Sequence, residues 1–417
     1  MSRFIIQGGN RLQGTVRAAA NKNGVLPMMA ATLLTDEPCT LLNVPVISDV
    51  AVMGQILQEV GADVEGIGTR ELRIHCKNIH RSDVRSDLVA RMRASILVLA
   101  PLVARTGRAQ LGHPGGCVIG RRDVGTHMDA IHALGATVNR SDDVYRIEAR
   151  ELTAADIFLD EASVTATENT MMAACAAKGT TVIKHAACEP HVVDFGHFLM
   201  SMGVRIEGLG SNVITIHGGR PLRGAVYHVA SDHIDVGTFA AAAAITRGSI
   251  KIEGVQPASM EMINLVLERM GVHIRFDGDC MQVDATRLRA TRKITTDVWP
   301  GFPTDMASPF ITLATQAEGT TLFHDWMYEG RIFFIDRLVA MGANIIICDP
   351  HRCVVTGPTP LSGKQVHSPD LRAGMALLLA GLASRGTTEL TGVELVERGY
   401  EDIVSRLSTL GASIEKV

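Results

Sequence analysis

Aromatic residues are scarce in this chain of 417 residues: they make up 4% of it, whereas hydrophobic residues as a whole make up 46%. A core of this size must therefore be built from aliphatic side chains and methionine, which suits many small repeated units. No segment approaches the roughly 18 consecutive apolar residues of a membrane-spanning helix. The N-terminus also has no charged and then apolar leader. We therefore expect a soluble, cytoplasmic protein.

Several chemical signatures are missing as well. The eight cysteines include no C-x-x-C pair, and several lie in apolar runs, which indicates a reducing compartment and argues against a disulfide framework. The sequence has no Walker A loop, no strand-led G-x-G-x-x-G and no H-E-x-x-H, so nucleoside triphosphate and dinucleotide chemistry are unsupported. The net charge of −4 provides no basic field for nucleic acid or anionic lipid. Local arginine clusters are therefore candidate sites for small anions.

A metal site has one candidate. His185, Cys188 and His191 are spaced like zinc ligands, with Asp194 and His197 nearby. No second ligand pair lies at a matching distance, and zinc motifs usually come with a complete ligand set. We therefore expect no metal, and the sequence leaves open whether these side chains meet.

The segment from Gly112 to Arg122 contains four glycines, one proline, Cys117 and two adjacent arginines. Glycine and proline at this density exclude an ordinary helix or strand, and a surface loop of this length can move. A cysteine beside arginines has the electropositive surroundings that make a thiol reactive. The pattern predicts a mobile, glycine-hinged lid that carries a thiol and an arginine to an anionic substrate. A flexible connector with an incidental cysteine is the alternative.

A short motif recurs six times: an apolar residue, glycine, alanine or valine, any residue, and a second apolar residue. Successive glycines are 74, 68, 68, 71 and 69 residues apart. Each motif follows an amphipathic stretch, so the glycine is predicted to end a helix and the next residues to open a strand. The six glycines are Gly61, Gly135, Gly203, Gly271, Gly342 and Gly411.

Six further stretches are apolar on nearly all sides, and a helix without a polar face is buried. Each repeat then has the order strand, buried helix, strand, amphipathic helix, strand, strand. The predicted buried helices span residues 28–34, 94–104, 170–177, 239–245, 309–314 and 375–383.

Six such units are too many for one core, and two groups of three make two domains. The predicted fold class is α/β: two inside-out, barrel-like α/β domains, each of three βαβαββ units of about 70 residues, with helices inside and sheets outside. We predict one N-terminal strand over residues 4–16. The predicted domains are residues 21–230, which carry the cysteine loop at 112–123, and residues 1–20 with 231–417. Ligands favour clefts between domains, so we expect one active site in the interdomain cleft.

Charged residues recur where buried helices begin. Lys22 and Asn23 precede the first such helix, Arg93 the second and Arg372 the sixth. Helix N-termini already favour anions, and arginine adds a planar fork that fits carboxylate or phosphate. For each residue alone, capping or a solvated charge is the simpler explanation. The repeated placement favours a shared anion site.

Asp305 precedes the fifth buried helix as an isolated carboxylate among cationic groups, which makes it a candidate general base. A helix N-cap is its alternative role. Arg331 and Arg398 lie in loops before the last two amphipathic helices, and Arg398 could equally be a surface charge.

Taken together, these segments resemble the enolpyruvyl transferases over essentially the whole chain, and within them the enzymes that act on UDP-N-acetylglucosamine. The sister enzymes that act on shikimate 3-phosphate share the sixfold fold but lack the cysteine loop. The matching segments are Lys22-Asn23, Met92 to Ser95, Pro114 to Gly120, Phe302 to Met306, Asp370 to Ala373 and Arg398 to Tyr400.

The resemblance implies an addition–elimination reaction in the first committed step of peptidoglycan synthesis. The 3′-hydroxyl of UDP-N-acetylglucosamine attacks C2 of phosphoenolpyruvate while C3 is protonated, and phosphate then leaves. It implies no metal and no organic cofactor. The expected partners are phosphoenolpyruvate and UDP-N-acetylglucosamine or a related nucleotide sugar, with no nucleic acid and no membrane. The expected state is a monomer or a weak homo-oligomer.

The resemblance also implies roles for single residues. Cys117 is the thiol that protonates C3, and a cysteine at this position is the target of the epoxide fosfomycin. Asp305 is the base for the hydroxyl, and Lys22 and Arg398 complete the catalytic set. The phosphoenolpyruvate-holding cations are Lys22, Arg93, Arg122, Arg372 and Arg398. The other substrate-binding residues are Asn23, Ser163, Val164, Asp305, Met327 and Arg331.

Departures from the family pattern lie mainly on the nucleotide side. Asp123 and Gly125 stand where the family commonly has proline and aspartate, in a segment that contacts the uridine. Glu161 stands where some members have a lysine near the diphosphate, and Gly330 replaces a usual asparagine. Two alternatives therefore stay open: the same chemistry on another nucleotide or nucleotide sugar, and a catalytically silent paralogue that binds a sugar nucleotide and regulates cell-wall flux.

Overall fold

The computed structural model describes residues 2–116, 119–120, 123–141 and 144–417. The chain divides into two compact units. The N-terminal unit consists of the described residues of 20–116 and 122–230, and the C-terminal unit of those of 1–19, 117–121 and 231–417. Within the described part of the chain, no helix has both the length and the apolar character needed to cross a lipid bilayer.

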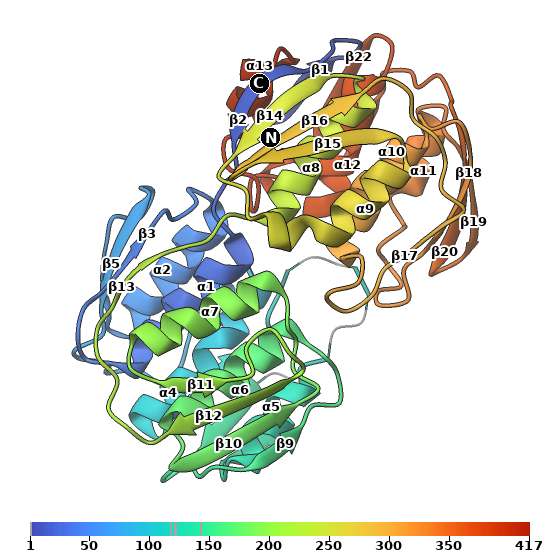
Figure 1. The fold of residues 1–417 in the computed structure, drawn as a ribbon. Coiled ribbons are helices and arrows are strands. Elements are labelled where there is room, and N and C mark those ends of the chain that lie inside the picture. Colours follow the sequence, from blue (N-terminus) through green and yellow to red (C-terminus); the bar gives the residue numbers. More distant parts are fainter. Residues whose placement is uncertain (1, 117–118, 121–122, 142–143) are drawn as a thin grey trace. The chain divides into compact units, whose positions relative to one another are not determined.

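Three helical segments form the interior of the N-terminal unit (Figure 1). They are α1 (Lys22–Ala31), the 3₁₀ segment η2 (Arg93–Val98) with α4 (Leu99–Thr106), and α6 (Val164–Ala176). α4 contacts α6, and η2 contacts both α1 and α6. The prediction of buried apolar helices is confirmed here: eight of the ten residues of α1 are buried. The remaining helices are η1 (Thr32–Leu34), α2 (Ser48–Val60), α3 (Ser86–Val89), α5 (Gly125–Ala133) and α7 (Pro190–Ser201).

Three sheets belong to the N-terminal unit, with the orders β13-β3-β5-β4, β6-β8-β7 and β11-β12-β10-β9. Burial alternates along their strands, as in β5, because one face packs on the helices and the other faces solvent. The strands are β3 (Cys39–Leu42), β4 (Asp63–Glu65), β5 (Glu71–His75), β6 (Arg108–Gly112), β7 (Thr137–Arg140), β8 (Val144–Glu148), β9 (Asp156–Phe158), β10 (Gly179–Lys184), β11 (Arg205–Glu207), β12 (Val213–Gly218) and β13 (Val226–His228).

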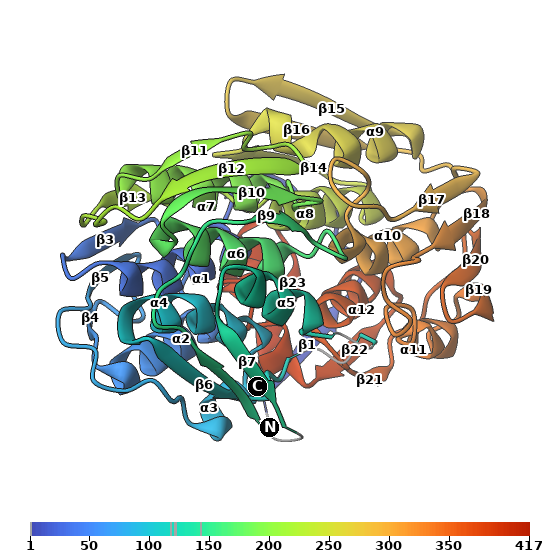
Figure 2. The same ribbon diagram turned by 90° about the horizontal axis from the view of Figure 1, so that it is seen from below.

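The C-terminal unit repeats this plan around α8 (His233–Ile245), α10 (Ala307–Ala314) and α12 (Leu371–Ala383), which contact one another (Figure 1, Figure 2). All thirteen residues of α8 are buried. Its N-cap is Asp232, whose carboxylate accepts the backbone N–H of Ile234 at 2.8 Å. The other helices are η3 (Pro257–Met260), α9 (Glu261–Arg269), η4 (Thr304–Met306), α11 (Ile335–Ala340), η5 (Val393–Leu395) and α13 (Ile403–Thr409).

The sheets of the C-terminal unit have the orders β15-β16-β14-β2, β17-β18-β20-β19 and β21-β22-β1-β23. In each, one parallel pair is followed by antiparallel strands, as in β17 with β18 and then β20. The strands are β1 (Arg3–Gln7), β2 (Gln13–Arg17), β14 (Ser249–Glu253), β15 (Val272–Asp277), β16 (Cys280–Ala285), β17 (Lys293–Thr295), β18 (Gly319–His324), β19 (Asn344–Asp349), β20 (Arg352–Gly357), β21 (Gln365–His367), β22 (Thr387–Thr391) and β23 (Ser413–Lys416).

The prediction of a single N-terminal strand over residues 4–16 is wrong. Two strands lie there in different sheets: β1 pairs with β22 and β23, and β2 pairs with β14. The chain breaks between them at Gly8 and Gly9, and Gly9 has a φ of +96°, which an L-residue rarely adopts. Two backbone hydrogen bonds of 2.8 Å mark the crossings of the chain, from Asn21 to the carbonyl of Ala230 and from Asp232 to that of Ala19.

The predicted role of the recurring glycine is confirmed in all six repeats. Each lies at the end of an amphipathic helix in the left-handed region that ends helices, where the absence of a Cβ removes the steric cost. The φ values are +111° at Gly61, +95° at Gly135, +104° at Gly203, +88° at Gly271, +108° at Gly342 and +92° at Gly411.

Candidate active site

The first predicted site residues of the N-terminal unit lie at the start of α1. Asn21 caps the helix, and its side-chain oxygen accepts the backbone N–H groups of Asn23 at 2.9 Å and Gly24 at 3.2 Å. Lys22 is the first residue of the helix, and its Nζ lies 2.7 Å from Oδ2 of Asp49 in α2. Both side chains of this ion pair are largely buried, so Lys22 is held by a partner that the sequence did not indicate.

Arg93 is the first residue of η2, so the second buried helical segment begins with a 3₁₀ turn. Its Nη2 donates to the carbonyl of Asp123 at 3.0 Å. A Cβ at Gly116 would lie 2.9 Å from Cβ of Arg93, and a Cβ at Gly115 would overlap the carbonyl of Ala90. These two glycines therefore allow the described start of the cysteine loop to pack against Ala90, at the end of α3, and against the start of η2. Cys117 and Arg122 themselves lie outside the described residues.

The next described part of the loop, Ile119 and Gly120, contacts residues beside Arg331. The backbone N–H of Gly330 donates to the carbonyl of Ile119 at 2.8 Å. A Cβ at Gly330 would lie 2.7 Å from the carbonyl carbon of Ile119, so this approach requires glycine at position 330. The replacement of a usual asparagine by Gly330 therefore has a structural correlate.

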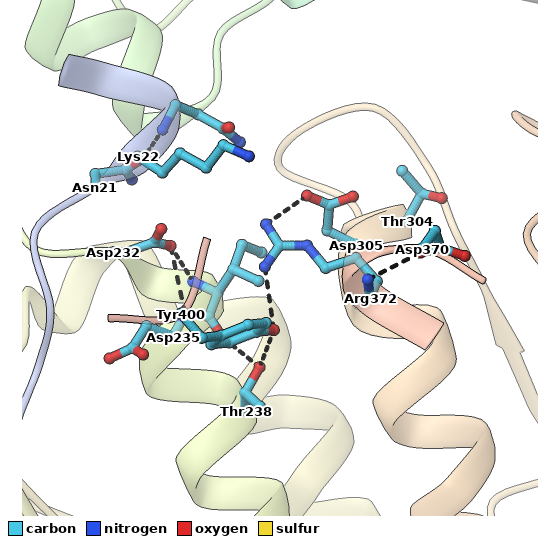
Figure 3. Close-up of polar contacts among 12 residues, drawn as sticks. Asn21, Lys22, Asp232, Asp235, Thr238, Thr304, Asp305, Asp370, Arg372 and Tyr400 are labelled. Atoms are coloured by element: carbon cyan, nitrogen blue, oxygen red, sulfur yellow. Dashed lines mark hydrogen bonds and ion pairs between the residues drawn. The ribbon is translucent and has the colours of Figure 1, made fainter. Parts of the chain in front are cut away.

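Asp305 lies between two buried arginines in the C-terminal unit, Arg331 and Arg372. Figure 3 shows its contact with Arg372. Oδ1 of Asp305 is 3.0 Å from Nη2 of Arg331, and its Oδ2 is 2.8 Å from Nη2 of Arg372. The arginine side chains are 3% and 6% exposed, whereas that of Asp305 is 29% exposed. The residue is part of η4 and does not serve as its N-cap, which is Pro303. An incoming anion would compete with this carboxylate for the two guanidinium groups.

The hydroxyl of Thr304 holds Arg331, and a second carboxylate, that of Asp325, holds this hydroxyl. Nε of Arg331 donates to Oγ1 of Thr304 at 3.2 Å, and Thr304 donates to Oδ2 of Asp325 at 2.5 Å. The other oxygen of Asp325 accepts the backbone N–H groups of Met327 at 3.0 Å and Tyr328 at 3.2 Å. The sequence analysis did not identify Thr304 or Asp325. Of the predicted substrate-binding residues, Met327 is held here by the hydrogen bond from its backbone N–H to Asp325.

Arg372 is the second residue of α12. Asp370 caps the helix by accepting the backbone N–H of Arg372 at 2.8 Å. Burial lowers the pKa of the Arg372 guanidinium, but neighbouring acids, Asp305 first among them, raise it above its ordinary value. Burial raises the pKa of Asp232 to about 6, and the charge of Arg372 opposes this rise. Arg372 therefore remains a cation while buried.

Other predicted residues are placed as follows. Ser163 is the N-cap of α6, its Oγ accepting the backbone N–H of Ala166 at 3.4 Å, and Val164 is the first residue of that helix. Arg398 lies half-buried in the turn before α13. The structure brings Asp305, Arg331 and Arg372 into direct contact, and it places Arg398 and Met327 in the same unit. Lys22, Asn23, Arg93, Ser163 and Val164 belong to the N-terminal unit.

The zinc-like spacing around His185 has no matching geometry. Nδ1 of His185 lies 2.8 Å from the carbonyl oxygen of Leu159, and His185 has a φ of +59°. Within the part of the chain that the structure describes, no three histidine, cysteine or acidic side chains are placed to hold a metal ion.

The sequence is similar to one family model and to many curated proteins. The model of EPSP synthase (3-phosphoshikimate 1-carboxyvinyltransferase) matches residues 6–407. UDP-N-acetylglucosamine 1-carboxyvinyltransferase from Bradyrhizobium diazoefficiens is 44% identical, over 99% of this chain and 98% of its own. The protein of that name from Treponema pallidum is also 44% identical, over the full length of both chains.

Solved structures share the fold. The enolpyruvyl transferase NikO from Streptomyces tendae superposes with a TM-score of 0.90 at 28% identity, over 100% of this chain and 99% of its own. EPSP synthase from Acinetobacter baumannii superposes with a TM-score of 0.75 at 19% identity, over the full length of both chains. At that identity the second likeness concerns the fold alone.

Proposed function

This chain belongs to the EPSP synthase (3-phosphoshikimate 1-carboxyvinyltransferase) family, and we propose that it transfers the enolpyruvyl group of phosphoenolpyruvate to the 3′-hydroxyl of UDP-N-acetylglucosamine, with release of phosphate. The observation that carries this proposal is the full-length similarity, at 44% identity, to proteins named UDP-N-acetylglucosamine 1-carboxyvinyltransferase. The reaction would be the first committed step of peptidoglycan synthesis. We place it in the cytoplasm, in a monomer or weak homo-oligomer, without metal, organic cofactor or nucleic acid.

The proposed chemistry begins at Asp305. Its carboxylate takes the proton of the sugar hydroxyl, whose oxygen then attacks C2 of phosphoenolpyruvate. Cys117 supplies a proton to C3, which gives a tetrahedral intermediate. Loss of a proton from C3 and departure of phosphate restore the double bond. The 29% exposure of the Asp305 side chain between two buried cations supports its role, because the group is accessible and anions are attracted to its neighbours.

Cationic side chains neutralise the substrate and the intermediate. Phosphoenolpyruvate carries up to three negative charges, and fixed cations in a water-poor site stabilise the charge that develops in the transition state. The proposed phosphoenolpyruvate ligands are Lys22, Arg93, Arg122, Arg372 and Arg398. Asn23, Ser163, Val164, Met327 and Arg331 are proposed to contact substrate or intermediate.

A second candidate is the same transfer to a different nucleotide or nucleotide sugar. The two departures near α5 support it because they are coupled in space. Asp123 turns its Oδ1 to the backbone N–H of Val124 at 2.7 Å, and a Cβ at Gly125 would lie 3.0 Å from its Oδ2. A carboxylate at 123 and a large side chain at 125 would therefore crowd each other.

The test is release of phosphate from phosphoenolpyruvate with UDP-N-acetylglucosamine, UMP or shikimate 3-phosphate as acceptor, in parallel. Turnover with the sugar nucleotide alone supports the leading proposal. Turnover with another acceptor alone supports the second candidate. Binding of UDP-N-acetylglucosamine without phosphate release from phosphoenolpyruvate, whichever acceptor is present, would contradict both and favour a silent paralogue.

A further inference from the structure

The guanidinium of Arg372 is held from two sides by different nitrogens (Figure 3). Nη2 donates to Asp305 at 2.8 Å, and Nη1 donates to the hydroxyl of Tyr400 at 3.1 Å. The carbon at the centre of the guanidinium also lies 5.4 Å from the centre of the Tyr400 ring. Asp305 is partly exposed, whereas Tyr400 is 1% exposed. The contact of Arg372 with Asp305 is therefore accessible to a ligand that could replace the carboxylate, whereas its contact with Tyr400 is buried.

The hydroxyl of Tyr400 is oriented by a second hydroxyl. Oγ1 of Thr238, which is fully buried in α8, donates to the carbonyl of Ile234 at 2.7 Å and lies 3.0 Å from the Tyr400 oxygen. Because Thr238 has one hydroxyl proton and uses it on Ile234, Tyr400 must donate to Thr238. The lone pairs of Tyr400 then face Arg372. Burial raises the pKa of Tyr400 above its ordinary value, so the phenol keeps the proton that this arrangement needs.

We propose that Tyr400, oriented by Thr238, is a positioning residue that keeps Arg372 in place while Nη2 exchanges Asp305 for the phosphate or carboxylate of phosphoenolpyruvate. The inference rests on the proposed function of this site. Exchange at Nη2 frees the carboxylate of Asp305 for the hydroxyl proton, and Nη1 remains bound throughout. Without the anchor, Arg372 would follow Asp305 or the anion, and the geometry would be lost.

The test compares Tyr400→Phe, which keeps the ring and removes the hydroxyl, with Thr238→Val and with the double variant. A hydrogen bond to a charged group accounts for about tenfold in affinity, so Tyr400→Phe should raise KM for phosphoenolpyruvate about tenfold and leave KM for the acceptor unchanged. Thr238→Val should change the same constant less. The double variant should match Tyr400→Phe alone, because Thr238 acts through Tyr400.

Tyr227→Phe is the matched control. It removes a hydroxyl that donates to Asp194 at 2.7 Å in the N-terminal unit, so it should lower the melting temperature and leave KM for phosphoenolpyruvate unchanged. The inference is overturned if Tyr400→Phe behaves like this control, or if the effects of Tyr400→Phe and Thr238→Val add. If Tyr400→Phe does not fold, Thr238→Val alone decides. Its KM for phosphoenolpyruvate should rise relative to its KM for the acceptor, and an unchanged ratio of the two would overturn the inference.

Calorimetric binding of phosphoenolpyruvate separates this inference from the proposed function. If wild-type protein gives no turnover with UDP-N-acetylglucosamine, the proposed function fails. Weaker binding of phosphoenolpyruvate to Tyr400→Phe than to wild type would then still support the anchor. Equal binding by the two proteins would overturn it.

Discussion

The carboxylate of Asp305 and the two guanidinium groups beside it form the charged centre of the candidate site in the C-terminal unit. Each arginine is buried, and each is fixed by a hydroxyl: Arg331 by Thr304 and Arg372 by Tyr400. Buried charges are stable only when they are paired and hydrogen-bonded, so the hydroxyls maintain the cations and the cations maintain an anion-attracting surface around Asp305.

Replacing Asp305 by asparagine should abolish most turnover while the protein still binds UDP-N-acetylglucosamine. The amide keeps the shape, and its oxygen can still accept a hydrogen bond from one of the two arginines, but it cannot take a proton. The loss of a general base costs about 10²–10⁴-fold in kcat. Steady-state kinetics and calorimetry on the same preparation measure both effects. Asp349→Asn, which removes a partly exposed carboxylate paired with Arg352, is the control. Near-normal kcat in Asp305→Asn would exclude Asp305 as the base.

Thiol labelling should distinguish Cys117 from most other cysteines. Burial raises the pKa of Cys76 to about 11 and those of Cys175 and Cys353 to about 12, so these thiols stay protonated and inaccessible near neutral pH. Fosfomycin should therefore add once, and intact-mass analysis should show that Cys117→Ser removes that adduct. Cys348 is exposed and serves as the control, because Cys348→Ser should leave the adduct in place. Unmodified wild-type protein would contradict the proposed role of Cys117.

The charged members of the site could be predicted from the sequence, but the groups that hold them could not. Arg93 and Arg372 attract notice because a cation at the start of an apolar helix breaks a pattern. No sequence pattern marks Tyr400, Thr238 or Thr304. A hydroxyl in a buried helix or turn is common, and its hydrogen-bond partner lies far away in the chain. Thr238 and Tyr400 are 162 positions apart in the chain, so no local pattern indicates their contact.

At the scale of elements, the predicted buried helices begin several residues too late. For example, the sequence predicts a helix from residue 239, whereas α8 begins at His233. Its first turn carries His233 and Asp235, which are polar and yet buried. A rule based on apolar residues skips such turns, although these are the turns that carry site residues such as Lys22 and Arg372. Helix interiors follow from composition, whereas their beginnings depend on tertiary partners.

Glu168, buried in α6, and Glu189, the partly buried N-cap of α7, form an acidic pair with a testable pH dependence. Burial, followed by the nearby Glu189, raises the pKa of Glu168 well above its ordinary value, and burial raises that of Glu189 from 4.5 to about 7. One oxygen of each carboxyl group is buried without a hydrogen-bond partner among the described residues. The folded state therefore binds the Glu189 proton more tightly than the unfolded chain. The resulting stability is present below pH 4.5 and is lost as pH rises through about 7.

Glu189→Gln removes the carboxyl group whose ionisation destabilises the folded state. The variant should therefore become more stable relative to wild type as pH increases from 5 to 8. The gain should be at most about 3 kcal/mol, because one pKa unit corresponds to about 1.4 kcal/mol and Glu189 keeps some exposure. Chemical denaturation at both pH values measures it. Glu151→Gln, at a surface ion pair with Lys178, should show no such trend. A constant difference between Glu189→Gln and wild type at both pH values would contradict the assignment.

At the scale of the whole molecule, the six repeats were readable because each leaves a local signature, the helix-ending glycine. Their strand pairing was less readable. The regularity of the repeat is broken at the N-terminus, where β1 lies between β22 and β23 and β2 lies beside β14. Pairing of β1 with β22 joins residues that are 380 to 388 positions apart, so it depends on closing a long loop, which no neighbouring residues encode.

This pairing makes the N-terminus a structural part of the C-terminal unit, and Ile6→Ala tests it. Ile6 is fully buried in β1 and faces α12 near Gly381. Truncating it should cost about 2–5 kcal/mol. Hydrogen exchange should then accelerate in Thr387–Thr391 and Ser413–Lys416, the two neighbours of β1, before it changes in the N-terminal unit.

Ile183→Ala in β10 is the reciprocal variant, since Ile183 is equally buried but belongs to the N-terminal unit. It should accelerate exchange in Val213–Gly218 and leave β22 and β23 protected. Because the same side chain is truncated to the same degree in both variants, the difference in location is due to strand pairing and not to the size of the cavity. Equal acceleration of both units by Ile6→Ala would mean that the two unfold together, and the N-terminal strand would then stabilise the molecule as one cooperative whole.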